Sequence, residues 1–253
     1  MMWTTMFFWF SQVIEENDAG LNNSMLNSSY VWGMSWFIFS EVMFFFAFFL
    51  ALGYIRNFAV PWLGGEGEKA ISNMLWPGFE SHWPLVVTPD QAAFPGPSEE
   101  MSLGTAYQHG GLAGVLGWIP LYNTILLLSS SVTVHIAHLN LKNNNRQKFH
   151  FWLALTLIMG YGFVALQVIE YYEAYVHMGL TLNSGAYGTT FFMLTGFHGF
   201  HVCLGAIILT IMLLRGLRGH FKPDDHFGFE AGSWYWHFVD VVWICLVAFV
   251  YVM

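Results

Sequence analysis

The chain has 253 residues, of which 56% are apolar, 19% are aromatic and only 9% are charged. Soluble domains carry about 25% charged residues, so this composition argues against a soluble protein and favours a membrane protein. The formal net charge of −8 argues against nucleic-acid binding, which needs a basic face.

The first predicted element is the remnant of a helix at residues 1–14. It is rich in apolar residues, meets Glu15, Glu16 and Asp18, and is too short to cross about 30 Å of hydrocarbon. It lacks the basic start and the small-residue cleavage site of an ordinary signal peptide. We therefore expect the end of a helix whose beginning is absent.

Five further segments are long and apolar enough to cross a bilayer, for which about 20 helical residues suffice. They lie at about residues 32–55, 112–139, 149–171, 187–214 and 232–253. None alternates apolar and polar residues as the strands of a membrane barrel do, and backbone groups in lipid require helices. The predicted fold is all-α, a single-domain polytopic transmembrane helix bundle over residues 1–253 with five full spans and the end of a truncated helix.

Lysine and arginine predict the orientation of the spans. Of the eight basic residues, six lie in two short loops: Lys142, Arg146 and Lys148 in one, and Arg215, Arg218 and Lys222 in the other. By the positive-inside rule both loops face the cytoplasm or matrix, and five spans then put the C-terminus outside. Residues 56–111, broken by proline and glycine, are predicted to form a long outer loop.

Glu41 is the clearest polar group inside a predicted span, about eleven residues from the start of its helix. The residues three and four positions away are Phe37, Ile38, Phe44 and Phe45, none of which can pair with a carboxylate. Without a partner from another helix, burial favours the neutral acid. A proton-linked or lipid-contacting site and a structural hydrogen bond to another helix both remain open.

His237 and Asp240 lie three residues apart and therefore share one helical face. We interpret them as a structural pair, in preference to a proton relay or a metal ligand with its supporting carboxylate. Glu170 falls with Glu173 at the outer end of the third span, among tyrosines typical of a membrane interface, and needs no special function there.

Two pairs of histidines with a spacing of three invite a heme or metal interpretation, namely His135 with His138 and His198 with His201. Two histidines on one helical face cannot supply both axial ligands of one heme, so close helix packing is favoured for these residues. Cys203 and Cys245 lie in apolar runs without metal-site spacing. No metal site and no catalytic residue is expected.

The residues Arg215, Arg218, His220 and Lys222 form a basic cluster at the inner end of the fourth span. This cluster is interpreted as topogenic charge, as a site for anionic lipid headgroups, or as both.

Five long strings resemble subunit III of the heme-copper cytochrome c oxidases. They are GMSWFIFSEVMFFFAFF, IPLYNTILLLSSS, EYYEA, YGTTFFMLTGFHGFHVCLGAIIL and HFGFEAGSWYWHFVDVVW. They follow the family's order over about residues 10–253, so a chance match is very improbable.

The resemblance implies a core subunit of a respiratory oxidase that oxidises cytochrome c, reduces oxygen to water and pumps protons. Subunit III itself carries no heme or copper, which other subunits hold. It packs mainly on subunit I, with subunit II in the same complex, binds phospholipid and sustains proton uptake and enzyme stability. The expected lipid-binding residues are Trp9, Glu41, Arg215, Arg218, His220 and Lys222. The style of the sequence favours the bacterial plasma membrane, with the mitochondrial inner membrane as the alternative.

The sequence departs from the family pattern near its start. The family usually has seven transmembrane helices, whereas helix one and most of helix two are missing here. Glu15 stands where the family often has a basic residue that anchors lipid. We expect either truncation or another chain that supplies the missing wall.

Two other classes of function stay open. One is a proton-coupled transporter that uses Glu41, although the sequence shows no inverted repeat and no broken helix. The other is a diheme cytochrome that uses His135, His138, His198 and His201.

Overall fold

The computed structural model describes residues 2–21, 23–97, 118–223 and 225–252. Within these ranges the regular structure is helical, and the one β-type pairing is an isolated bridge between Lys222 and Asp225. Five helices are long and apolar enough to cross a membrane. The predicted all-α fold with five spans is confirmed.

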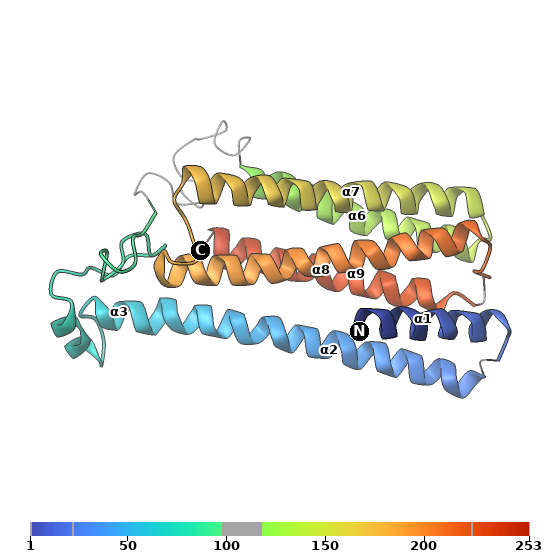
Figure 1. Cartoon of the computed structure of the whole chain (residues 1–253), viewed down its shortest axis with the longest axis horizontal. Helices are drawn as coiled ribbons and strands as arrows, with labels where there is room; N and C mark the ends of the chain where they lie inside the picture. Colours follow the sequence, from blue (N-terminus) through green and yellow to red (C-terminus); the bar gives the residue numbers. More distant parts are fainter. Residues whose placement is uncertain (1, 22, 98–117, 224, 253) are drawn as a thin grey trace.

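The elements follow in this order: α1 (Met2–Asp18), α2 (Ser24–Tyr54), the π turn η1 (Ile55–Ala59), α3 (Val60–Leu63), the 3-10 turn η2 (Ala70–Leu75), α6 (Ile119–Lys142), α7 (Arg146–Tyr172), the π turn η3 (Glu173–His177), α8 (Gly185–Leu217), α9 (Phe227–Leu246) and the π turn η4 (Val247–Val252). The five long helices run side by side along the long axis of the molecule (Figure 1). The pairs α6–α7, α7–α8, α8–α9 and α6–α9 pack together, and α2 packs on α8 and α9.

Local sequence explains where the helices begin and end. Asn23 caps α2 by accepting a hydrogen bond from the Leu26 N–H at 2.8 Å. Pro120 sits in the first turn of α6, where its missing N–H costs nothing. Gly219 follows α8 with φ of 78°, a left-handed conformation that ends helices and that glycine adopts without strain.

The first spanning helix extends further than the sequence analysis predicts. The prediction ends this span at residue 55, whereas the helical segment runs over Met25–Leu63 and the connecting region begins at Gly64. The π turn η1 ends two residues before Pro61, and such a turn is one way for a helix to continue past a residue without an N–H. Residues 112–117 of the second predicted span lie outside the described residues.

Helix α9 forms the centre of the bundle. Trp236 and Trp243 on α9 have no exposed surface. The Trp236 Nε1–H donates to Ser130 Oγ at 2.9 Å, and the Trp243 Nε1–H donates to Thr124 Oγ1 at 3.0 Å, so both indoles are bonded to α6. A Cβ on Gly160 would lie 2.6 Å from Trp236 Cη2, so the indole fits because this α7 residue is a glycine.

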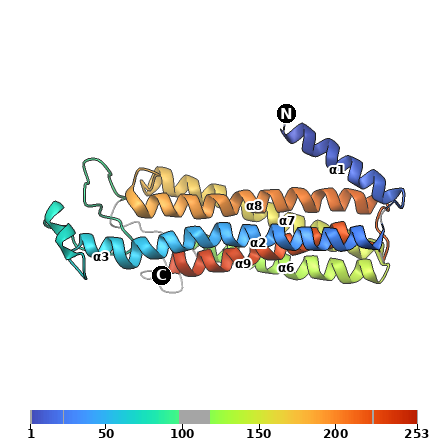
Figure 2. The same ribbon diagram turned by 90° about the horizontal axis from the view of Figure 1, so that it is seen from below.

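Helices α1 and α2 lie at the edge. In the most apolar window of α2 and its continuation only 11% of residues are buried, against 56% in α9 and its continuation. Figure 2 shows α1 leaving the bundle at an angle. Both basic loops, α6–α7 and α8–α9, lie at one end of the bundle together with the turn between α1 and α2 (Figure 1).

Candidate functional site

Glu41 on α2 meets His201 on α8 near the middle of both helices. The distance from Glu41 Oε2 to His201 Nε2 is 2.8 Å, and the two side chains are 22% and 9% exposed. The carboxyl group that had no partner along its own helix therefore finds one on another helix. Of the alternatives left open for Glu41, the hydrogen bond between helices is present.

The second nitrogen of His201 fixes the position of a proton. His201 Nδ1 lies 2.6 Å from the Phe197 carbonyl oxygen, and a carbonyl can only accept, so Nδ1 carries a proton. The hydrogen bond at Nε2 then needs either a protonated Glu41 with a neutral imidazole or a carboxylate with an imidazolium. In both states one proton lies between the two groups and the pair has no net charge.

Aromatic side chains enclose this pair. The rings of Phe45 and Tyr235 lie 5.0 Å and 6.4 Å from the His201 ring, and both residues are almost completely buried. In this largely apolar surrounding the contact between Glu41 and His201 gives each polar group the partner that burial requires. The Glu41 side chain stays 22% exposed, and it belongs to the peripheral helix α2.

The other polar residues predicted inside the spans occupy packed positions. His237 Nδ1 lies 2.6 Å from Ser131 Oγ and 3.8 Å from the Asp240 carboxylate, a separation longer than a hydrogen bond. His198 is fully buried and its Nε2 lies 3.2 Å from the Val239 carbonyl oxygen. His198 thus joins α8 to α9 inside the bundle, whereas His237 joins α6 to α9 with 39% of its side chain exposed.

Glu170 and Glu173 differ although they are one turn apart. Glu170 is 2% exposed and lies beside Tyr251, whereas the Glu173 side chain is 44% exposed and 3.9 Å from His177. Glu170 therefore belongs to the interior of the bundle. Only Glu173 has the exposure expected of an interfacial carboxylate.

The predicted basic cluster divides into inward-facing and outward-facing residues. Arg215 is 9% exposed and its guanidinium lies 4.9 Å from the centre of the Phe221 ring. Arg218 and Lys222 are exposed, and His220 is half-buried. Arg218 and Lys222 therefore present their charge outside the chain, whereas Arg215 packs under the loop.

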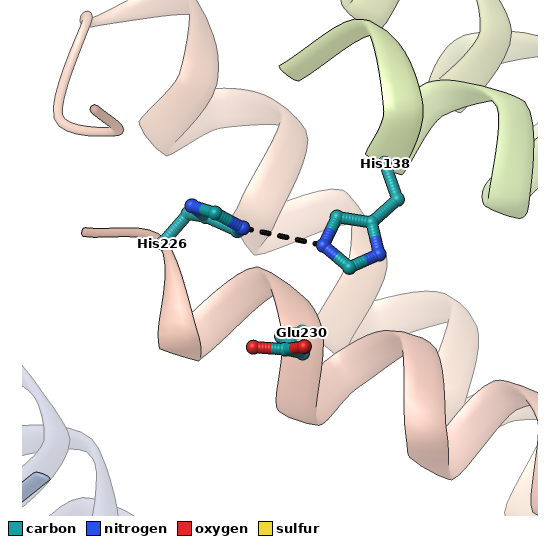
Figure 3. Close-up of side chains that lie close together, drawn as sticks. All are labelled: His138, His226 and Glu230. Atoms are coloured by element: carbon teal, nitrogen blue, oxygen red, sulfur yellow. Dashed lines mark hydrogen bonds between the residues drawn. The ribbon is translucent and has the colours of Figure 1, made fainter. Parts of the chain in front are cut away.

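The remaining predicted residues are Trp9, His135 and His138. Trp9 on α1 is 68% exposed and stacks on Phe10. His135 is exposed, whereas His138 Nε2 lies 3.2 Å from Nε2 of His226, a residue that the sequence analysis did not single out (Figure 3).

Comparison with known proteins gives one consistent family. The family model described as Cytochrome c oxidase subunit III matches residues 95–253. A relative named Cytochrome c oxidase subunit 3 from Carassius auratus is 38% identical over 248 residues, which covers 98% of this chain and 78% of the relative. Proteins of the same name from Formosania lacustris and Oryctolagus cuniculus are 39% and 37% identical, with the same coverage.

Proposed function

This chain belongs to the cytochrome c oxidase subunit III family, and we propose that it is a non-redox subunit that binds phospholipid and sustains proton uptake and stability. As a member of this family it is a subunit of an oxidoreductase complex with several membrane spans. The redox chemistry of the complex, from cytochrome c to oxygen, then belongs to heme and copper in other subunits. The contact between Glu41 and His201 is the basis of the proposed role in proton uptake.

We propose subunit I as the main partner, within a complex that also contains subunit II. The observation that supports a partner is the composition of the outer face of α2, where Trp32, Trp36, Phe39 and Phe46 are at least half exposed. A bilayer accepts such a face as readily as a protein does, so lipid and protein share it in this proposal. The proposed location is the bacterial plasma membrane, with the mitochondrial inner membrane as the alternative and the C-terminus outside.

Phospholipid is proposed to lie against α1 and α2 with its headgroup at the basic end of the bundle. Exposed aromatic residues on α1, such as Trp9, supply apolar contact for acyl chains. Arg218 and Lys222 are exposed in the α8–α9 loop, at the end where α1 turns into α2 (Figure 1). Exposed basic residues attract anionic headgroups by about 1 kcal/mol each.

The role in proton uptake rests on the proton held between Glu41 and His201. This is the single observation that carries the proposal, because a carboxyl and an imidazole 2.8 Å apart can exchange which of them holds the proton without any change in net charge. Such a pair can hold one proton beside a proton pathway of a neighbouring subunit.

Co-purification from native membranes tests the assignment. A tagged version of this chain, extracted in mild detergent, is expected to bring a larger subunit that contains heme and copper. Optical spectra assign the heme to a subunit after the chain is dissociated from its partner. Purification of the chain alone would contradict the proposal, and a Soret band from the isolated chain would indicate a diheme cytochrome instead.

A further inference from the structure

Three potential metal ligands meet at the basic end of the bundle. They are His138 from α6, His226 at the start of α9 and Glu230 one turn later on α9 (Figure 3). One ligand atom from each lies within 4.8 Å of the others, and all three residues are half-buried. Because His226 and Glu230 are four residues apart, the helix presents them on the same face toward His138.

The spacing of the two imidazoles fits a shared ion. Zinc binds histidine nitrogen at about 2.0–2.1 Å, so two nitrogens at a tetrahedral angle lie roughly 3.3 Å apart. The observed distance from His138 Nε2 to His226 Nε2 is 3.2 Å. The two nitrogens therefore already have the separation that a common tetrahedral ion requires.

The tautomer of His226 also suits a ligand. His226 Nδ1 lies 3.2 Å from the Lys222 carbonyl oxygen, which can only accept, so Nδ1 carries the proton and Nε2, which faces His138, keeps its lone pair. Metal-binding histidines commonly donate their second N–H to a carbonyl in this way. Without an ion, His138 Nε2 must donate its proton to His226; with an ion, the proton of His138 moves to Nδ1.

Glu230 supplies the negative charge. Among the described residues its carboxylate has no hydrogen-bond partner, and it lies next to the two rings. A half-buried carboxylate without a partner is costly near the membrane, and an ion between it and the imidazoles removes that cost.

We propose that His138, His226 and Glu230 bind one divalent transition-metal ion, with zinc as the best match, at the inner end of α6 and α9. Two imidazoles and one carboxylate favour zinc over magnesium or calcium, which prefer oxygen ligands. Water completes the coordination at the exposed side. The ion links the end of α6 to the start of α9 and holds the basic α8–α9 loop in place.

Elemental analysis of the tagged protein, in the assembly that it brings from the membrane, tests the proposal. Samples equilibrated at buffered free zinc are compared for wild type, His226→Gln and Glu230→Gln, with zinc, copper, nickel and manganese counted per chain. Each variant is expected to weaken the site by at least roughly 100-fold and to lose one zinc per chain. X-ray absorption at the zinc edge should show light-atom ligands at about 2.0–2.2 Å.

His135→Gln is the matched control, because it removes an exposed imidazole one turn earlier on α6 and leaves the three ligands intact. This variant should keep the zinc content of wild type. Glu230→Gln preserves shape, so it remains informative if a histidine variant fails to assemble. The proposal is overturned if wild type binds no metal of this class, or if Glu230→Gln and His226→Gln bind as much zinc as His135→Gln does.

Discussion

Helices α2 and α9 are similar in mean hydropathy, but α2 lies at the edge of the bundle and α9 at its centre. Their most apolar windows have mean hydropathy of 2.1 and 1.8, yet 11% of the residues are buried in the first and 56% in the second. In a bilayer, lipid satisfies an apolar side chain as well as a protein core does. Hydropathy therefore identifies a membrane helix but does not distinguish a central helix from a peripheral one.

Polar and small residues distinguish the central helix α9 from the peripheral helix α2. The indoles of α9 donate to hydroxyl groups on α6, and glycines on neighbouring helices make room for Trp236. On α2, by contrast, Ser35 and Ser40 donate to carbonyls of their own helix, as backbone-directed hydroxyls do in lipid. Glu41 is different because its side chain reaches α8 and pairs with His201 at 2.8 Å.

The largest difference between the two regions is expected from adding a single methyl group. Gly160→Ala places Cβ 2.6 Å from Trp236 Cη2, so the packed bundle must shift at a cost of about 1–3 kcal/mol. A Cβ added at Gly53 on α2 meets no atom within 4 Å, so Gly53→Ala should be tolerated. Thermal unfolding of the detergent-solubilised protein measures both.

Gly162→Ala is the control within the same helix, since its Cβ would lie at an ordinary 3.7 Å from Leu126 Cδ1. Equal loss of stability in Gly160→Ala, Gly162→Ala and Gly53→Ala would show that helix position does not matter, and the comparison between α2 and α9 would fail.

The second prediction concerns lipid at the basic end. Replacing both Arg218 and Lys222 by glutamine should remove about 2 kcal/mol of attraction for anionic headgroups and lower the bound phospholipid count in native mass spectrometry. The double variant Arg56→Gln with Lys69→Gln makes the same charge change at the opposite end and should keep the count. An unchanged count in the first variant would remove the lipid role of the loop.

The third prediction concerns one buried hydrogen bond. Ser130→Ala leaves the fully buried Trp236 N–H without its acceptor and should lower stability by about 1 kcal/mol. Ser35→Ala on α2 removes only a bond within the helix and should change stability by less than about 0.5 kcal/mol. Both are read from the midpoint of thermal unfolding, and a larger loss for Ser35→Ala would reverse the assignment of core and periphery.

The sequence was sufficient for the fold class because long apolar segments with few charges admit no other solution in a bilayer. It could not pair Glu41 with His201, since their contact depends on how α2 and α8 are rotated about their axes, and 160 residues separate them. It also grouped Arg215 with Arg218 and Lys222 in one basic cluster, although the Arg215 guanidinium packs on the Phe221 ring.

The cluster at His138 was missed for a different reason. The predicted fifth span begins at residue 232, whereas α9 begins at Phe227. With His226 and Glu230 assigned to a loop, their spacing of four residues carried no meaning. A helix start at Phe227 makes His226 the N-cap and puts Glu230 one turn later, which would have made the histidine–glutamate pair a candidate.

The smallest effect on the initial rate is expected for a substitution of Glu41. This substitution distinguishes a structural role of the Glu41–His201 contact from a role in holding a proton. In Glu41→Gln the amide N–H can still donate to His201 Nε2, so the contact between α2 and α8 survives, but no proton is shared. Assembly and the initial rate of oxygen consumption should stay within about twofold of wild type, equivalent to roughly 0.4 kcal/mol. The number of turnovers before inactivation should fall.

Glu173→Gln is the matched control at an exposed carboxylate and should affect neither rate nor lifetime. Oxygen-electrode traces of the assembled enzymes, followed until activity decays, give both quantities. Near-total loss of initial turnover in assembled Glu41→Gln would make Glu41 part of the reaction itself, whereas an unchanged lifetime would reduce the pair to a structural contact between a peripheral helix and its bundle.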